Sequence, residues 1–381
     1  MVIDKKGLAI LGSTGSIGQQ TLDIVRAFPN NFQVIALAAN NNIYSLENQI
    51  KEFKPKFISF NNDAENKHLL EPYGYFNSTM ENMVTDPDVD IVIAATNSCS
   101  SLIPIIEAIK AKKDIALANK ESIVMAGNLI SKLSKENNIN IFPLDSEPNA
   151  IWQCIKGEDL GVYKLILTAS GGAVRNQKIS DLSRLTPKQV LNHPNWEMGS
   201  KITIDSSTLI NKALEVAESH WLFNIEWEKI EILMHPQSII HSMVEFNDGS
   251  IKAQMSHPDM RLPIQYALLQ EKRQINPNLK RLDLKKINQL NFEQLDKNKY
   301  PCFELSLETL KLGHTWPAVL CGIDETAVEL FLKNKIQFNQ ILTLIEKALS
   351  IHRPKQNPDI QQILDSFNWA KKEGYQLAKE L

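Results

Sequence analysis

Short aliphatic runs and longer amphipathic runs alternate from residue 7 to about residue 150. Runs such as LAIL, FQVIALAA, FISF, IVIAA, DIALA and INIFPL are typical of buried strands, whereas QQTLDIVRAF and IYSLENQIKEF repeat their apolar residues at helical spacing. This βαβα order predicts an α/β fold with a mainly parallel, doubly wound sheet that has helices on both faces. Ligands of such sheets bind at the carboxyl ends of the strands.

The pattern changes after residue 150. Strand-like runs (VYKLILTA, KITID, KIEILM, IIHSMVEF and SIKAQM), with the turn NDGS between the last two, predict an antiparallel or mixed sheet in a central α+β domain. From residue 303 four amphipathic runs predict a C-terminal α-helical bundle. A chain of 381 residues is longer than the length at which a single hydrophobic core stops growing. We therefore expect domains at 1–150, 151–275 and 303–381, with a polar connector at 276–302.

Composition narrows the class of protein. Hydrophobic residues make up 43% and charged residues 22%, which is ordinary for a globular protein, and a net charge of -3 gives no general attraction to nucleic acid or to an anionic membrane. Four scattered cysteines fit a reducing compartment, and no apolar run approaches the roughly 18 residues of a membrane span. We expect a cytoplasmic protein, although an organellar protein without its transit peptide has the same features.

A glycine-rich turn follows the first predicted strand. Gly12, Gly15 and Gly18 lie between LAIL and a predicted helix, where glycine lets backbone N–H groups approach a pyrophosphate. The spacing GxxGxxG also fits a plain tight turn. After the second strand the chain reads AANNN. The lack of an acid there leaves room for a 2'-phosphate and favours NADP over NAD, but the stretch also lacks an arginine or lysine to bind that phosphate.

Two acidic or basic motifs follow later strands. In PLDSEPNA, Asp145 and Glu147 share one face of an extended backbone and suit a hard cation, but they equally suit the cap and first turn of a helix. In ANKES, Lys120 stands at a strand end, where it reaches a ligand or is simply solvated.

Three motifs lie in the central region. In SSTLINKALE one helix face carries Asn211, Lys212 and Glu215, preceded by two serines that suit a phosphate; a capped surface helix has the same pattern. The loop at 191–202, HPNWEMG at its centre, suits a lid that closes over a ligand, and TASGG suits an anion. Trp196 equally suits a core position, and we interpret His235 and His241 as structural because their spacing fits no trusted zinc site.

Together these motifs resemble the 1-deoxy-D-xylulose 5-phosphate reductoisomerase family. The resemblance extends nearly end to end and rests on GSTGSIG, ANKES, LDSEPNAIWQ, TASGG, HPNWEMG, IDSSTLINKALE, HPQSIIHSMVEF and PDMRLPIQYAL in the family's order and spacing. It implies a Rossmann-like NADPH-binding domain at 1–150 and a catalytic domain that binds metal and substrate at 151–275. It further implies a homodimer that contacts neither nucleic acid nor membrane.

The resemblance also assigns roles to residues. It implies catalytic roles for Lys120, Asp145, Glu147, His193 and Glu215, and binding of one Mg²⁺ or Mn²⁺ by the three acids among them. The substrate residues it implies are Ser146, Ser170, His193, Trp196, Ser206, Asn211 and Lys212. The cofactor residues it implies are Gly12, Ser13, Thr14, Gly15, Ser16, Ile17, Asn41, Asn119, Glu121 and Gly199.

The activity implied by the resemblance is a metal-dependent rearrangement of 1-deoxy-D-xylulose 5-phosphate, followed by reduction with NADPH to 2-C-methyl-D-erythritol 4-phosphate in the non-mevalonate isoprenoid pathway. An NADP-linked sugar-phosphate dehydrogenase that performs no rearrangement is the alternative, and it needs no divalent metal. A catalytically silent NADP-sensing protein of the same fold is a third interpretation. Such a protein is expected to lack one of the five catalytic residues, all of which are present.

Overall fold

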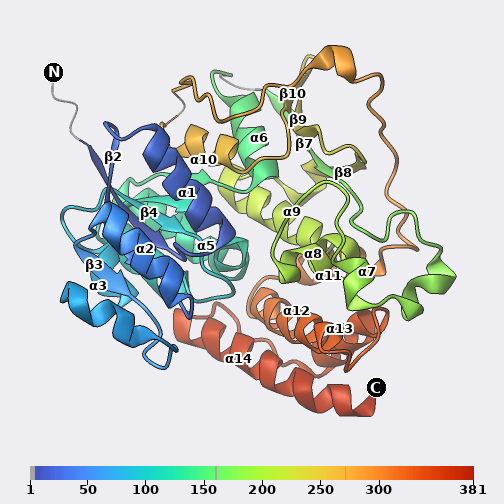
Figure 1. Cartoon of the computed structure of the whole chain (residues 1–381). Helices are drawn as coiled ribbons and strands as arrows, with labels where there is room; N and C mark the ends of the chain where they lie inside the picture. The colour runs from blue at the N-terminus through green and yellow to red at the C-terminus, as the bar shows by residue number, and fades with distance from the viewer. Residues whose placement is uncertain (1–4, 159–160, 271) are drawn as a thin grey trace. The chain divides into compact units, whose positions relative to one another are not determined.

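The computed structural model describes residues 5–158, 161–270 and 272–381 (Figure 1). The chain divides into two compact units, and each is formed by segments that are distant in sequence. The first unit comprises Met1–Ser122, Asn128–Asn149 and Asp259–Lys280, and the second comprises Ile123–Gly127, Ala150–Pro258 and Arg281–Leu381. The predicted domain boundaries at 150, 275 and 302 stay predictions.

The first unit contains a six-stranded sheet in the order β3-β2-β1-β4-β5-β6, with every neighbouring pair parallel. Its strands are β1 (Lys6–Leu11), β2 (Phe32–Ala38), β3 (Phe57–Ser59), β4 (Ile91–Ala94), β5 (Asp114–Leu117) and β6 (Ile141–Pro143). The central strands are apolar and buried on both sides, as the continuous aliphatic runs require. The parallel doubly wound sheet is therefore confirmed.

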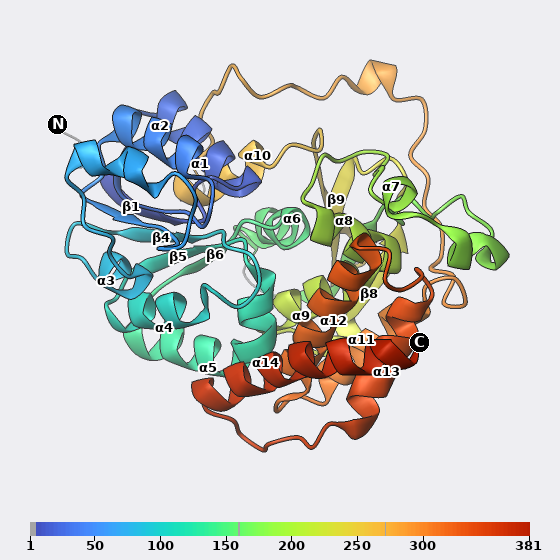
Figure 2. The ribbon, with the colours of Figure 1, turned by 60° about the horizontal axis from the view of Figure 1, so that its bottom comes forward.

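Helices cover both faces of this sheet. In Figure 2, α1 (Ser16–Ala27) and α2 (Ile43–Phe53) lie on one face with α10 (Arg261–Leu268), and α4 (Leu102–Lys110) and α5 (Lys120–Asn137) lie on the other. The short α3 (Met80–Val84) packs against α4. Each β-α connection brings a helix start to the carboxyl edge of the sheet, where ligands of this fold bind.

The second unit contains a four-stranded mixed sheet in the order β10-β9-β7-β8. Its strands are β7 (Val162–Ala169), β8 (Ile230–Met234), β9 (Ile240–Phe246) and β10 (Ile251–Met255). The β7–β8 pair is parallel, and the β7–β9 and β9–β10 pairs are antiparallel. This arrangement confirms the predicted mixed sheet.

Helices α6 (Ser146–Ile155) and α9 (Ile210–Phe223) meet on this sheet. Ile151 and Cys154 of α6 share one buried cluster with Val216 of α9 and with Leu165 and Leu167 of β7. The packing fixes the axial positions of the two helices, because protein cores fill space closely and transmit any shift. The polar ends of both helices are thereby held in place.

The C-terminal helices also belong to the second unit. They are α11 (Pro301–Lys311), α12 (Trp316–Leu332), α13 (Gln340–Ile351) and α14 (Ile360–Leu377). Helix α12 packs against both α13 and α14, and α11 packs against α9. A β-carbon at Gly322 of α12 would lie 2.4 Å from the carbonyl oxygen of Phe367 in α14, so glycine permits this close approach. The predicted C-terminal helical region is confirmed.

One predicted strand is wrong. KITID, residues 201–205, lies inside helix α8 (Ser200–Thr208). Its β-branched residues favour a strand locally, but Thr203 and Ile204 are buried along the helix, and Lys201 and Asp205 pair across one helical turn. Tertiary packing therefore overrides the local preference.

The predicted connector at 276–302 is irregular chain apart from one short 3-10 helix, η4 (Leu284–Lys286), and its last two residues, which begin α11. Residues 276–280 belong to the first unit and the remainder to the second. The connector is tied to the sheet where Met234 and Glu293 exchange backbone hydrogen bonds of 2.9 and 3.0 Å. In the part of the chain that the structure describes, no helix is long and apolar enough to cross a membrane.

Candidate active site

The glycine-rich turn lies at the carboxyl end of β1, where the strand order changes direction between β1 and β4. Gly12 has φ of 87°, and a β-carbon there would lie 2.3 Å from the carbonyl oxygen of Ala95. A β-carbon at Gly18 would lie 2.3 Å from the carbonyl oxygen of Gly12. These two glycines are therefore required by close backbone packing, whereas Gly15 is exposed at the start of α1.

The rest of this turn is buried at Ser13 and more exposed from Thr14 to Ile17. Gln49 donates a 2.9 Å hydrogen bond from its side chain to the carbonyl oxygen of the buried Ser13. Thr14, Ser16 and Ile17 are partly or fully exposed beside the N-terminus of α1. Backbone N–H groups at a helix start attract anions, so the turn can hold a pyrophosphate. Asn41 is also exposed after β2, where it accepts a 2.9 Å hydrogen bond from Asn61.

Asn119 fixes the loop after β4. It is buried, caps α5 through Ser122, and donates side-chain hydrogen bonds to the carbonyl oxygens of Thr96 and Ser98, 3.1 and 2.6 Å away. It also donates to Glu121 over 3.1 Å. Since β4 lies between β1 and β5, this loop lies beside the glycine-rich turn at the same sheet edge.

Lys120 and Asp145 form an ion pair at the ends of the neighbouring strands β5 and β6. The Lys120 Nζ lies 2.6 Å from Asp145 Oδ2, and the two side chains are only 7% and 11% exposed. The other oxygen of Asp145 accepts a 2.9 Å hydrogen bond from the backbone N–H of Ser146, the first residue of α6. Asp145 thus serves the helix start with one oxygen and faces a buried ammonium with the other.

The carboxylates of Asp145, Glu147 and Glu215 converge. Each contributes one oxygen, and these three oxygens lie within 4.8 Å of one another. Glu147 stands one turn before Ile151 on α6, and Glu215 is next to Val216 on α9, so the shared core of the two helices explains the meeting. Three clustered carboxylates, each with a charge of -1 and one oxygen ligand, fit a hard divalent cation such as Mg²⁺ or Mn²⁺.

Glu215 is surrounded by polar partners on its own helix. Asn211 donates a 2.5 Å hydrogen bond to Glu215 Oε1, and Lys212 pairs with Glu215 Oε2. Lys212 and Glu215 are almost completely buried. The predicted helix face is therefore confirmed as a geometric arrangement, and it is not the surface helix of the alternative interpretation.

His193 and Ser170 meet within the second unit. Ser170 Oγ lies 3.0 Å from His193 Nε2, and His193 Nδ1 accepts from the backbone N–H groups of Asn195 and Trp196, 3.2 and 3.0 Å away. Because Nδ1 is an acceptor, the ring is neutral and Nε2 carries the proton, which it donates to Ser170. Burial lowers the pKa of His193 from its ordinary value of 6.5, in agreement with a neutral ring.

The two serines before α9 differ. Ser206 and Ser207 lie in the last turn of α8, and Leu209, with φ of 59°, separates α8 from α9. Ser207 is buried and accepts a 3.2 Å hydrogen bond from the backbone N–H of Ala173. Ser207 therefore holds the TASGG turn, while the partly exposed Ser206 has the accessibility that a phosphate contact needs.

The predicted lid contacts His241, the second histidine of HPQSIIH. The rings of Trp196 and His241 lie 5.9 Å apart in an edge-to-face arrangement, and Trp196 is partly exposed, so it is not a buried core residue. His235 bonds the backbone through both ring nitrogens, which agrees with a structural role. Gly199, inside the predicted lid, is the N-cap of α8, so the lid residues 200–202 belong to that helix. Asn195, which no sequence pattern singled out, lies between His193 and Trp196 in this segment.

Family models match most of the chain. The model described as 1-deoxy-D-xylulose 5-phosphate reductoisomerase matches residues 8–127, and the model of that enzyme's C-terminal domain matches residues 141–223. A third model, described as DXP reductoisomerase C-terminal domain, matches residues 255–373.

Individual relatives agree with the models. The 1-deoxy-D-xylulose 5-phosphate reductoisomerase 1 of Bacillus thuringiensis is 44% identical and covers 98% of each chain, and the enzyme of Thermoanaerobacter pseudethanolicus is 46% identical over 94% of this chain and 96% of its own. The solved Zymomonas mobilis enzyme in complex with NADPH has a TM-score of 0.91, 37% identity and coverage of 99% and 100%. A solved reductoisomerase complex with NADPH, fosmidomycin and magnesium has a TM-score of 0.91, 35% identity and coverage of 98% of both chains.

Proposed function

Because the chain belongs to the 1-deoxy-D-xylulose 5-phosphate reductoisomerase family, we propose that it converts 1-deoxy-D-xylulose 5-phosphate into 2-C-methyl-D-erythritol 4-phosphate. The chain is an NADPH-dependent oxidoreductase of the non-mevalonate isoprenoid precursor pathway. The observation that carries the proposal is the convergence of three carboxylates beside a buried lysine. A rearrangement that depends on a divalent metal needs such a group of oxygen ligands.

Asp145, Glu147 and Glu215 would hold Mg²⁺ or Mn²⁺. When bound, the ion supplies Lewis acidity at the ketone and hydroxyl oxygens of the substrate. The protein's part is to keep the three acids aligned, which α6 and α9 do through their shared core. Lys120 places a positive charge 2.6 Å from Asp145, and we assign to it and to Ser146 contacts with the reacting end of the substrate.

The other end of the substrate carries a phosphate. We assign its binding to Ser170, Ser206, Asn211 and Lys212, which combine hydroxyl, amide and ammonium donors in the second unit. Charge-assisted hydrogen bonds of this kind are strong and directional. Holding a group that does not react orients the part that does, and this retains both fragments of a chain that is cleaved and rejoined.

The segment 191–202, which is irregular up to Gly199 and continues into the start of α8, is proposed as the lid. His193 already reaches Ser170, and Trp196 brings a large apolar ring to the same loop. Such a lid excludes water, which strengthens every electrostatic interaction beneath it. A neutral His193 with its proton on Nε2 is a hydrogen-bond donor to an oxygen of the substrate.

NADPH is assigned to the first unit. Backbone N–H groups of the segment 12–17 would receive the pyrophosphate, and Asn41 would lie near the ribose phosphate. Asn119 and Glu121 are proposed on the nicotinamide side, and the cofactor role of Gly199, which belongs to the second unit, stays a prediction from the family resemblance. Gly12 supports the first assignment because no other residue fits its backbone conformation beside Ala95.

An NADP-linked sugar-phosphate dehydrogenase without rearrangement remains the alternative chemistry. It transfers hydride and needs no divalent metal, so it leaves the group of three acids unexplained. We also propose a homodimer in the cytoplasm, by analogy with the family.

The test is NADPH oxidation by the purified protein with 1-deoxy-D-xylulose 5-phosphate, with and without Mg²⁺, and then with a chelator. The expected result is oxidation that requires substrate and metal together and that recovers when metal is restored. NADPH that binds but is not oxidised under any divalent metal would overturn the proposal.

A further inference from the structure

We propose that Asn195 is a positioning residue that fastens the lid to the turn at 235–238 and thereby keeps His193 aligned with Ser170. The inference rests on the proposed function of the lid, but its geometry is independent of that function. Asn195 Nδ2 donates to the carbonyl oxygen of Pro236 over 2.7 Å and to Ser238 Oγ over 3.0 Å. One side-chain amide therefore uses its NH₂ group to hold two points of the turn.

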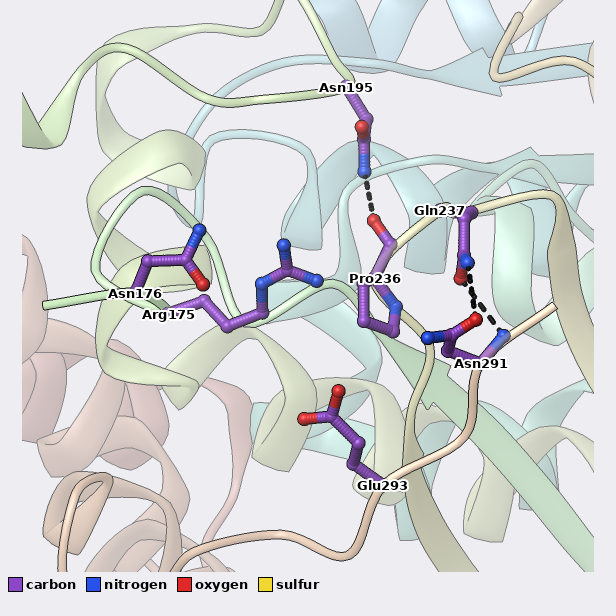
Figure 3. A pocket seen from close by; sticks show the side chains of 7 residues that line it. All are labelled: Arg175, Asn176, Asn195, Pro236, Gln237, Asn291 and Glu293. Carbon is purple, nitrogen blue, oxygen red and sulfur yellow. Dashed lines mark hydrogen bonds between the residues drawn. The ribbon is translucent and has the colours of Figure 1, made fainter. Parts of the chain in front are cut away.

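The turn that receives Asn195 is itself rigid. Gln237 donates to Asn291 Oδ1 over 3.0 Å and accepts from the Asn291 backbone N–H over 3.3 Å. Figure 3 shows these contacts beside the bond between Asn195 and Pro236. Ser238 is 8% exposed and has φ of 51°, a conformation that its surroundings must hold. A fixed turn can thus set the position of a loop that binds to it.

On the lid side, the position of Asn195 is coupled to that of His193. The backbone N–H groups of Asn195 and Trp196 both donate to His193 Nδ1, which orients the ring toward Ser170. Release of the Asn195 side chain frees the backbone that makes these bonds. The path from the turn to Ser170 therefore consists of hydrogen bonds through two residues of the lid.

A polar pocket of about 450 Å³ lies beside this fastening. Figure 3 shows Asn195, Pro236, Arg175 and Glu293 among the side chains that line it. Because a hollow of this size adjoins Asn195, apolar packing there does not replace the two hydrogen bonds when they are removed. The edge-to-face contact of Trp196 with His241 then remains as the lid's ring contact.

The experiment compares Asn195→Ala and Asn195→Asp with Asn176→Ala. The Asp variant keeps the side-chain shape but removes the NH₂ donors, and Asn176 is an exposed asparagine on the same pocket outside the lid. Opening of the lid is measured by the rate at which a glutamate-specific protease cleaves after Glu197, an exposed residue of the lid. Mass spectrometry identifies the fragments, and the kinetic constants for 1-deoxy-D-xylulose 5-phosphate and NADPH are measured in parallel.

Both Asn195 variants are expected to be cleaved after Glu197 about 25-fold faster, since each of two neutral hydrogen bonds contributes roughly a factor of five. The ratio kcat/KM for the sugar phosphate is expected to fall by a similar factor while the NADPH Kd stays unchanged, and Asn176→Ala is expected to match the parent protein. Wild-type cleavage rates in both Asn195 variants would overturn the proposal. If the parent protein proves inactive but the cleavage rates still differ, the proposed function fails and the role of Asn195 stands.

Discussion

The substitution Glu215→Gln tests the group of three carboxylates. Glutamine keeps the size of the side chain and an oxygen that accepts from Asn211, but it removes one negative charge. At an effective dielectric constant of 20, two like charges 4.8 Å apart repel by roughly 3.5 kcal/mol. Removal of one carboxylate abolishes two of the three repulsive pairs, which together amount to ~7 kcal/mol of repulsion. The positive charges of Lys120 and Lys212 offset part of that repulsion. A divalent cation therefore gains much less from binding to the variant.

After this compensation we expect Mg²⁺ affinity to fall at least about 100-fold, which corresponds to about 2.7 kcal/mol, and turnover to be lost. Isothermal titration with Mg²⁺ measures the affinity, and fluorescence titration measures NADPH binding, which should remain. Glu218→Gln is the matched control, because Glu218 is a fully buried acid one turn further along α9 and is not one of the three clustered acids. Equal Mg²⁺ affinity in Glu215→Gln and the parent protein would refute the reasoning.

Three further predictions concern other parts of the chain. Gly12→Ala should weaken NADPH binding at least tenfold because its β-carbon meets a backbone carbonyl at 2.3 Å, whereas Gly74→Ala, with positive φ but open space, should not; NADPH titrations of both variants compare them. Folding lowers the pKa of His193, so its contribution to the free energy of unfolding is complete above the unfolded pKa of 6.5 and is lost as pH falls through the folded pKa. Denaturant unfolding between pH 8 and pH 5 should therefore show a smaller decrease in the free energy of unfolding for His193→Gln than for the parent protein. Lys201→Met should lower the free energy of unfolding by about 3–5 kcal/mol, because it removes the ammonium that pairs with the buried carboxylates of Asp205 and Asp324. Denaturant titration of the variant and the parent protein measures this difference.

Periodicity predicted the architecture well where local and tertiary preferences agree. The aliphatic runs of the first unit are buried on both sides and form the parallel strands, and the amphipathic runs after residue 303 form helices. KITID failed because its β-branched residues are buried along a helix. No local pattern carries that information, since it depends on what packs against α8.

The motifs indicated which residue types stand at strand ends, but not how they meet. Asp145 was open to two interpretations, and the structure shows it bonding the helix start through one oxygen and facing Lys120 with the other. The contact between Ser170 and His193 depends on how the segment between them folds back. Asn195 stood inside a quoted motif, but its partners Pro236 and Ser238 lie more than 40 residues away, beyond any local signal.

The central claim is that the enzyme rearranges a carbon skeleton before it reduces it. The most direct measurement is ¹³C NMR of the product formed from ¹³C-labelled 1-deoxy-D-xylulose 5-phosphate with NADPH and Mg²⁺. The account predicts the branched skeleton of 2-C-methyl-D-erythritol 4-phosphate, and no product when a chelator removes the metal. A reduced product with an unbranched skeleton would contradict it and would identify the chain as a dehydrogenase.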